Sequence, residues 1–338
     1  MSSRKLQRTS LVHHRGTGVK LRTPLLVPSF SSKGFKATEL ARIFESSGEF
    51  ITETYLISAY DIAHQHLPKP RDLSFKPELL FLDSGGYEIS KDQDLSAVEI
   101  PRTVPSSWTL QQLTEILDNW PDEIATVLVS YDHPSERKSF AEQVKSARLL
   151  FKGRPHLCTF LLKPQTDDEH TLNNCLREAM AHATELQSFD IIGVTEKEIG
   201  RSPLERMVRI ARFRAALDDA RVSAPIHVFG ALDPLSACLY FLAGAEIFDG
   251  QTWIRYAYDD MGRCVYGSNH GAMEYGIDVR ENEVKTRFVS QNVYQLVGLQ
   301  RKLREFDVTG NYEKLRPHEK LLANAMDSLE TELQKGVS

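Results

Sequence analysis

Eight apolar segments alternate with amphipathic segments along the 338 residues of this chain, and this alternation limits the fold more than any other feature. Most of the eight are continuously apolar, as expected for strands that are buried on both faces of a parallel sheet. Eight strands alternating with helices over roughly 250 residues predict an α/β protein with a (β/α)8 TIM barrel. An open doubly wound sheet is the alternative. The predicted strands cover residues 25–30, 50–55, 79–83, 125–132, 156–162, 189–195, 225–231 and 246–252.

The segments between these strands carry apolar residues at helical spacing. Two of the helices have clear start signals. Residues 202–205 form a capping box with Pro203 at the first helical position, and Asp233-Pro234 repeats the same N-cap pattern. The predicted helices cover residues 37–46, 110–120, 138–151, 171–186, 203–217 and 234–243.

Two polar segments interrupt the alternation. Residues 89–107 contain two prolines and are expected to form a long loop over the barrel mouth. Residues 256–288 are rich in Gly, Tyr and charge, and are expected to form a small irregular or β subdomain. We therefore divide the chain into a barrel over residues 1–255, this subdomain, and C-terminal helices over 289–338 that pack back on the barrel. One of these helices is expected at 291–306.

The composition is that of a globular protein with a large core, since 41% of the residues are apolar and the formal net charge is −5. That charge excludes a global basic field that would recruit nucleic acid, although a local basic groove is enough for binding. The four cysteines form no CxxC pair, which favours a reducing, cytoplasmic compartment. No apolar stretch follows the basic N-terminal residues or approaches the roughly 20 residues of a membrane span, so we expect neither a secretory signal nor a membrane helix.

Three aspartates stand at the C-terminal ends of predicted strands: Asp83 after the third, Asp132 after the fourth and Asp249 after the eighth. Taken singly, each is explained as well by a turn or a helix N-cap. In a parallel barrel, however, these strand ends meet at one mouth, where ligands bind. Three carboxylates gathered there repel one another and raise at least one pKa, which is typical of acid/base sites.

Other signals near the predicted mouth are weaker. Gly193-Val194 and Gly230 end the sixth and seventh strands and could offer backbone N–H groups to a ligand, although glycine at a strand end is often structural. Lys163, after the fifth strand, is either a binding cation or a solvated lysine. His133 and His227 have no partners at metal-ligand spacing. The chain contains no P-loop, no GxGxxG after the first strand and no GxSxG elbow.

Taken together, these motifs resemble the tRNA-guanine transglycosylase family, the queuine and archaeosine tRNA-ribosyltransferases. Its members are (β/α)8 barrels that exchange guanine for a 7-deazaguanine. The resemblance runs from about Thr23 to Phe306. It rests on the motif Asp83-Ser84-Gly85-Gly86-Tyr87 and on the late Phe248-Asp249, in this order and spacing. It extends to residues 23–28, 53–56, 229–234 and 244–249.

The resemblance implies a role for each of these side chains. Asp249 matches the nucleophile that attacks C1′ of the target nucleoside and leaves a covalent aspartyl-glycosyl intermediate. Asp83 matches the acid/base residue that gives a proton to the departing base and takes one from the incoming base. Asp132 matches the carboxylate that accepts from the guanine N–H edge, and Tyr87 would stack on the base. The remaining implied contacts to the base are Ser84, Gly85, Gly86, Gly193, Val194 and Gly230, and Lys163 is a further candidate from its place at a strand end.

The chain departs from this family where its members bind zinc through a CxCxxC set and a downstream His. Here that region holds only Cys264, and Gln291-Asn292 stands about where the His would be. One thiol cannot build a four-ligand zinc site, so we predict no zinc and no other cofactor. The family's base-reading Gly-Ile-Gln-Gln segment is replaced by residues 161–164, Leu-Leu-Lys-Pro. In the tRNA enzymes the zinc subdomain and its surroundings contact the nucleic acid, so a DNA substrate becomes at least as plausible as tRNA.

The leading hypothesis is a zinc-free transglycosylase that replaces guanine in a nucleic acid, DNA slightly before tRNA, with a 7-deazaguanine such as preQ0. Lys33, Lys36 and Arg255 are candidate phosphate contacts, and the target nucleotide must leave its stack to react. Two alternatives stay open. One is a non-catalytic partner subunit, which usually lacks the nucleophile or the acid/base aspartate, whereas this chain keeps both. The other is a hydrolase or transferase of a free nucleoside or small glycoside. Because family members often form dimers, the expected protein partners are a second copy or a related subunit.

Overall fold

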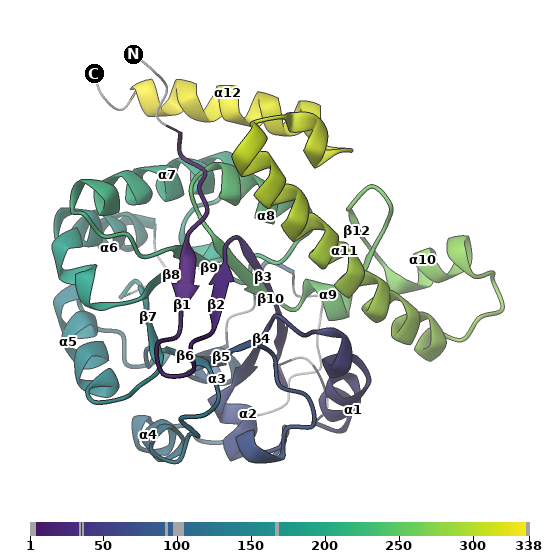
Figure 1. Ribbon diagram of the computed structural model, residues 1–338, viewed down its shortest axis with the longest axis horizontal. Coiled ribbons are helices and arrows are strands. Elements are labelled where there is room, and N and C mark those ends of the chain that lie inside the picture. Colours follow the sequence, from purple (N-terminus) through teal and green to yellow (C-terminus); the bar gives the residue numbers. More distant parts are fainter. Residues whose placement is uncertain are drawn as a thin grey trace.

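The computed structural model describes residues 5–33, 35, 37–91, 94–96, 105–165 and 169–335, without the side chains of 37 and 169–173. Eight parallel strands close into a barrel in the order β10-β3-β4-β5-β6-β7-β8-β9 (Figure 1). The predicted (β/α)8 barrel is therefore confirmed, and the open doubly wound sheet is excluded. The barrel strands are β3 Leu25–Phe30, β4 Thr54–Ser58, β5 Leu79–Asp83, β6 Thr126–Val129, β7 Leu157–Leu161, β8 Ile191–Thr195, β9 Ile226–Phe229 and β10 Ile247–Gly250.

Six of the eight predicted strands have different bounds in the structure, and two of them differ by three residues or more at one end. The second was placed at 50–55, but Gly48–Phe50 forms a 3-10 turn and β4 begins only at Thr54, which pairs with Leu79. The fourth was extended to Asp132, whereas β6 ends at Val129. Asp132 therefore lies in the loop between β6 and helix α5 (Phe140–Phe151) rather than in a strand.

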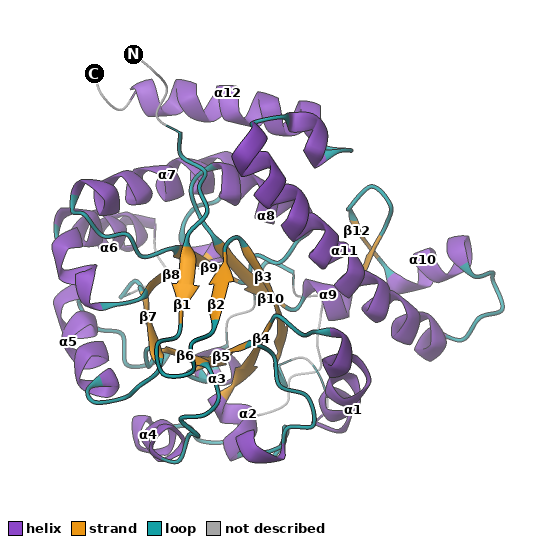
Figure 2. Ribbon diagram, in the orientation of Figure 1, coloured by secondary structure: helices purple, strands orange, loops and turns teal. Residues whose placement is uncertain are grey.

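Helices surround the barrel strands as an outer ring (Figure 2). The predicted start signals are confirmed, because Ser202 accepts from the Glu205 N–H and Asp233 accepts from the Ser236 N–H. Four-residue helices α3 and α9 directly follow β5 and β10. The helices up to this point are α1 Ala37–Ser47, α2 Ala59–Ala63, α3 Gly86–Ile89, α4 Leu110–Asp118, α5 Phe140–Phe151, α6 Glu169–Ala181, α7 Pro203–Asp219, α8 Pro234–Leu242 and α9 Thr252–Arg255. No helix in the described ranges combines the length and apolar content that a membrane-crossing segment needs.

A short hairpin that the sequence did not predict covers the N-terminal end of the barrel. Its strands are β1 Leu11–His13 and β2 Lys20–Arg22, and they lie across the barrel in the view of Figure 1. Val12 and Leu21 pack against the first residues of the barrel strands, among them Leu25. This end is closed by apolar packing, so the C-terminal end of the strands is the one that a ligand can enter.

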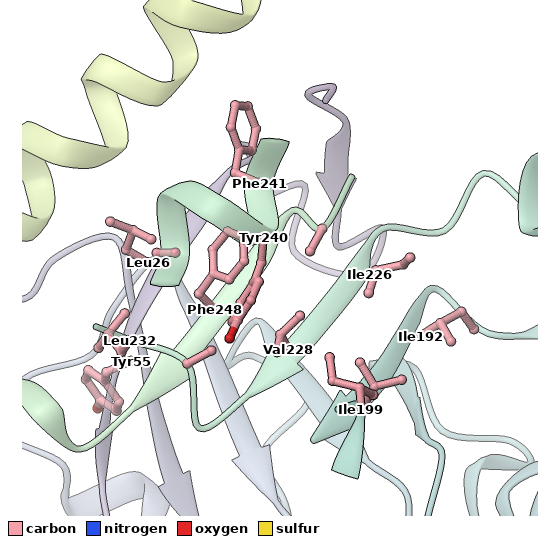
Figure 3. Packing of buried hydrophobic residues seen from close by; sticks show 14 of the residues in the cluster. Leu26, Tyr55, Ile192, Ile199, Ile226, Val228, Leu232, Tyr240, Phe241 and Phe248 are labelled. Atoms are coloured by element: carbon pink, nitrogen blue, oxygen red, sulfur yellow. The ribbon is translucent and has the colours of Figure 1, made fainter. Parts of the chain in front are cut away.

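The main core lies between the barrel and its helices. Tyr240 of α8 lies beside Phe248 and Val228 of β10 and β9, Phe241 points to the other side of the helix, and all four are buried (Figure 3). Burying side chains of this size contributes roughly 1.5–3 kcal/mol each. This packing fixes β10, the strand that carries Asp249.

The chain after β10 forms a small extension and two long helices. The segment predicted at 256–288 contains strands β11 Ala257–Tyr258 and β12 Cys264–Val265, helix α10 Gly267–Glu274 and the first turns of α11. The helix predicted at 291–306 is longer, α11 Glu281–Thr309, and it packs on β3 and α8. The final helix is α12 Glu319–Lys335, which packs against α7 and α8.

Asn292 of α11 ties this extension to the barrel. The side chain is fully buried, and its Nδ2 donates to the carbonyls of Trp253 at 2.8 Å and Tyr256 at 2.7 Å. Its Oδ1 accepts from the Tyr258 N–H at 2.8 Å. One amide thereby satisfies three backbone groups where the chain leaves β10.

Candidate active site

The open mouth of the barrel holds a cavity that is lined by strand ends and the loops after them. A concave site with several convergent polar groups is the usual place for a ligand. The three predicted carboxylates, Asp83, Asp132 and Asp249, all line it. The other lining residues are Ser29, Ser31, Leu56, Ser84, Gly86, Tyr87, Glu88, Ser90, Asp94, Pro134, Arg137, Leu161, Lys163, Thr195, Lys197, Phe229, Gly230, Gly250 and Gln251.

Asp249 is held on the β10 wall by donors from both neighbouring strands. Its Oδ2 accepts from the Ser29 hydroxyl of β3 at 2.7 Å, and its Oδ1 accepts from the Gly230 N–H at 3.3 Å. His227 Nε2 of β9 lies 3.0 Å from Oδ1. Because His227 Nδ1 has no hydrogen-bond partner, we assign the imidazole proton to Nε2, which donates to Asp249. The carboxylate is therefore fixed in one rotamer by short side chains.

The His227 ring is itself held in place. It is fully buried, stacks on Phe229 with ring centroids 3.8 Å apart, and meets the edge of Phe81 at 5.6 Å. His227 was not predicted as a site residue, because it has no partner at metal-ligand spacing in the sequence. The alternation of His227 and Phe229 in one strand could have indicated that both point into the barrel.

Asp83 ends β5 and shares the cavity with Asp249. Its Oδ2 accepts from the Gly85 N–H at 3.1 Å. Burial, opposed by that hydrogen bond and reinforced by the charges of Asp249 and Asp132, raises the pKa of Asp83 to about 6. A carboxyl with this pKa exchanges a proton readily near neutral pH, as a general acid/base must.

The glycine pair after Asp83 allows two loops to touch. Gly85 has φ +90°, and a Cβ there would lie 2.7 Å from the Trp108 ring nitrogen. A Cβ on Gly86 would lie 2.2 Å from the carbonyl oxygen of Asp132. Gly85 and Gly86 were predicted to contact the base. In the structure, the close approach that requires a glycine at each position is to another part of the protein. Only Gly86 of the two lines the cavity.

Asp132 is surrounded by long charged side chains. Arg137 donates to its Oδ1 at 3.1 Å, and Lys163 Nζ lies 3.5 Å from its Oδ2. Lys163 also donates to Glu198 at 3.0 Å and to Thr195 at 3.1 Å. Burial lowers the pKa of Lys163, but Glu198 and Asp132 outweigh that effect and raise it, so the amine stays an ammonium.

A fourth carboxyl, Glu88 of α3, lines the cavity and was not predicted. It is buried, and it accepts from the hydroxyls of Ser31 and Ser58, the latter at 2.8 Å. Burial, followed by the charges of Asp61 and Asp83, raises the pKa of Glu88 to about 8, so the group carries a proton at neutral pH. No local pattern marks it, because the two serines belong to β4 and to the loop after β3.

Several predicted contacts lie elsewhere. Gly193 and Val194 sit inside β8, and a Cβ on Gly193 would lie 2.7 Å from the Phe229 ring, so this glycine makes room for a lining residue. Lys33 Nζ donates to the carbonyls of Tyr87 at 2.7 Å and Ser90 at 2.9 Å. Lys36 falls outside the described residues.

Arg255, a predicted phosphate contact, is paired within the chain. Its side chain is only 3% exposed and forms an ion pair with Asp94 at 2.7 Å. Asp94 lies 161 residues earlier in the chain, so no local pattern could reveal the pair.

Within the described part of the chain, no three His, Cys, Asp or Glu side chains come together as metal ligands. The Cys264 thiol instead donates to Asp233 Oδ2 at 3.0 Å. In comparisons with known proteins, no family model matches the chain and no curated protein is found similar to it.

Proposed function

We propose that this protein is a base-exchange transglycosylase that replaces guanine in a nucleic acid, DNA slightly before tRNA, with a 7-deazaguanine such as preQ0. One observation carries the proposal. A carboxylate fixed by three hydrogen-bond donors, Asp249, shares a cavity with Asp83, a carboxyl whose pKa is raised to about 6. Two carboxyl groups in such different environments suit a nucleophile and an acid/base residue.

The two groups would divide the reaction between them. An Asp249 oxygen attacks C1′, and the bond between C1′ and the base nitrogen breaks with its electron pair going to guanine. Asp83 gives its proton to the departing guanine. The incoming base then returns a proton to Asp83 and attacks C1′, which releases Asp249 from the covalent intermediate. Atoms and charges balance without any redox partner.

Asp132 and Lys163 would read the guanine. The Watson–Crick edge of guanine places two N–H donors beside the O6 acceptor. A carboxylate with an ammonium 3.5 Å away offers acceptors and a donor in the matching order. The guanine N–H groups would then take the place that the Arg137 guanidinium occupies on Asp132.

A second candidate function is favoured by the state of the basic side chains. Arg255 is paired with Asp94, and Lys33 donates to two backbone carbonyls. With these groups engaged inside the chain, a free nucleoside or small glycoside would be an adequate substrate for the same carboxylates.

The test offers labelled guanine or preQ0 with duplex DNA, single-stranded DNA, unmodified tRNA and free nucleosides in parallel. We expect label in a nucleic acid, and we expect Asp249→Asn to lower incorporation at least about a thousandfold. Asp327→Asn, the same charge change on an exposed residue of α12, serves as the control. Label in nucleosides alone supports the second candidate. Full exchange by the Asp249→Asn variant would show that the nucleophile is assigned wrongly.

A further inference from the structure

Two side chains direct hydrogen-bond donors at one point beside the cavity, Arg255 of α9 and Tyr87 of α3, and Gln251 holds the Arg255 guanidinium in place; we call these three residues the Arg255 cradle. Arg255 Nη2 contacts the Tyr87 hydroxyl at 3.3 Å and the Gln251 carbonyl oxygen, and Gln251 Nε2 is anchored on the Ser31 carbonyl at 2.9 Å. The Lys33 ammonium lies 4.1 Å from the centre of the Tyr87 ring. The cradle follows directly from the strands that carry Asp83 and Asp249.

An anion already occupies the cradle, and it belongs to the chain. Asp94 receives Arg255 Nη1 on both oxygens, at 2.7 and 2.8 Å, and the Tyr87 hydroxyl at 2.8 Å. Burial opposes ionisation of Asp94, but Arg255 with the Ser96 and Tyr87 hydroxyls holds its pKa below the usual value. Burial also raises the pKa of Tyr87, so its hydroxyl remains a donor. The site is thus built for a planar or tetrahedral oxyanion.

The segment that brings Asp94 into the cradle is attached by polar contacts. Asp94 also accepts from the Ser96 N–H and hydroxyl, and the Tyr256 hydroxyl donates to the Ser96 carbonyl at 2.9 Å. Leu95 between them is 53% exposed, so it contributes little burial. Such an attachment can be exchanged, because another oxyanion would satisfy the same donors.

The Arg255 side chain needs an anion at all times. Its side chain is only 3% exposed, and its Nε–H has no hydrogen-bond partner among the described residues. Removing the partner of a buried charge is strongly destabilising. Asp94 can therefore leave only if another anion enters.

We propose that the Arg255 cradle is a phosphate-binding site in which Asp94 is a built-in substitute, and that a backbone phosphate of the substrate strand displaces its carboxylate. The choice of a nucleic-acid phosphate rests on the proposed function. A nucleotide whose C1′ reaches Asp249 carries phosphates on both sides of its sugar, and Asp94 lines the same cavity as Asp249. The exchange of one anion for another keeps Arg255 neutralised.

The experiment is a double-mutant cycle on binding, which requires no exchange activity. Dissociation constants for a labelled single-stranded DNA, and for inorganic phosphate against chloride at equal ionic strength, are measured for the wild-type protein, Asp94→Asn, Arg255→Gln and the double variant. We expect Asp94→Asn to bind both ligands about tenfold more tightly, and we expect Arg255→Gln to abolish that gain. Asp327→Asn reports the effect of one lost negative charge far from the cavity.

Each other outcome overturns the proposal. An unchanged or weaker affinity of Asp94→Asn means that Asp94 is a structural clamp. A gain that persists with Arg255→Gln is a general charge effect. Tighter phosphate binding without tighter DNA binding rejects the nucleic acid as the ligand, and exchange activity, assayed separately, reports on the proposed function alone.

A second measurement keeps the native ion pair and guards against variants that do not fold. A fluorophore is attached at Leu95→Cys, where the added thiol reacts first because burial raises the pKa of the four native thiols. We expect its anisotropy to fall when phosphate or DNA saturates the protein, as the segment leaves the cradle. Constant anisotropy at saturating DNA would reject the displacement.

Discussion

Asp249 and Asp132 lie on opposite sides of the barrel, because β10 and β6 are four strands apart in either direction round it. Asp249 is held by Ser29, His227 and a backbone N–H, all short and placed by the strands on either side. Asp132 stands in a loop and is held by Arg137 and Lys163, which are long, charged and flexible. The difference shows which side is prepared for a covalent step and which for the exchange of ligands. A reacting group needs one fixed geometry, whereas a binding group needs partners that can be replaced.

The largest effect is expected when Asp249 loses one of its hydrogen-bond donors, His227. His227→Phe keeps a ring over Phe229 but loses the hydrogen bond to Asp249, so we expect kcat to fall about a hundredfold with little change in KM. Steady-state exchange kinetics measure both constants, and His227→Gln, which keeps a donor, should recover part of the loss. A kcat within threefold of wild type would mean that the nucleophile does not depend on the hydrogen bond from His227.

The second test uses pH and the carboxyl between the two sides. The pKa of Asp83 is raised to about 6, so its acid form is present below that pH and is lost above it. Because departure of guanine needs the acid form, we expect single-turnover release of labelled guanine to fall about tenfold per pH unit above pH 6. Asp83→Asn should be slow and independent of pH. A wild-type profile that is flat from pH 5 to 8 would contradict the assignment.

The third test removes a cation that faces Asp132, the carboxylate proposed to bind the base. Lys163→Met loses the ammonium that faces Asp132, so we expect the KM for guanine to rise about tenfold while kcat changes less than threefold. His227→Phe is expected to change kcat and Lys163→Met is expected to change KM, so the two variants together test the comparison. If Lys163→Met lowers kcat and leaves KM unchanged, the division into a reacting side and a binding side fails.

The smallest expected effect concerns stability, through Glu88. Its pKa is raised to about 8 in the folded protein, while an unfolded glutamate has a pKa near 4.3, so between these values the folded state binds the extra proton. Stability therefore falls as pH rises through this window. Urea unfolding of wild type and Glu88→Gln at pH 5 and pH 8 measures it, and the variant should lose less stability. Equal slopes in the two proteins would show that Glu88 is ionised throughout.

The sequence predicted the barrel because its information is local: eight continuous apolar runs mark the buried strands. It also placed Asp83 and Asp249 at strand ends, and both line one cavity. The hairpin β1–β2 escaped prediction because each of its strands has three residues, too few for a period to show.

The partners of the site could not be predicted in the same way. Glu88 depends on Ser31 and Ser58, and Arg255 depends on Asp94, contacts that only the closed barrel creates. A basic side chain after a strand reads as solvent-exposed until its acidic partner is known. The part of the site that escaped prediction is therefore the part made by long-range pairs.

Asn292 limits what natural variation can do at the exit of β10. Its three hydrogen bonds need two donors and one acceptor at the reach of a single methylene. Aspartate lacks the donors, glutamine is one carbon too long, and a histidine cannot serve all three backbone groups. A saturation library at this codon should therefore return asparagine almost alone.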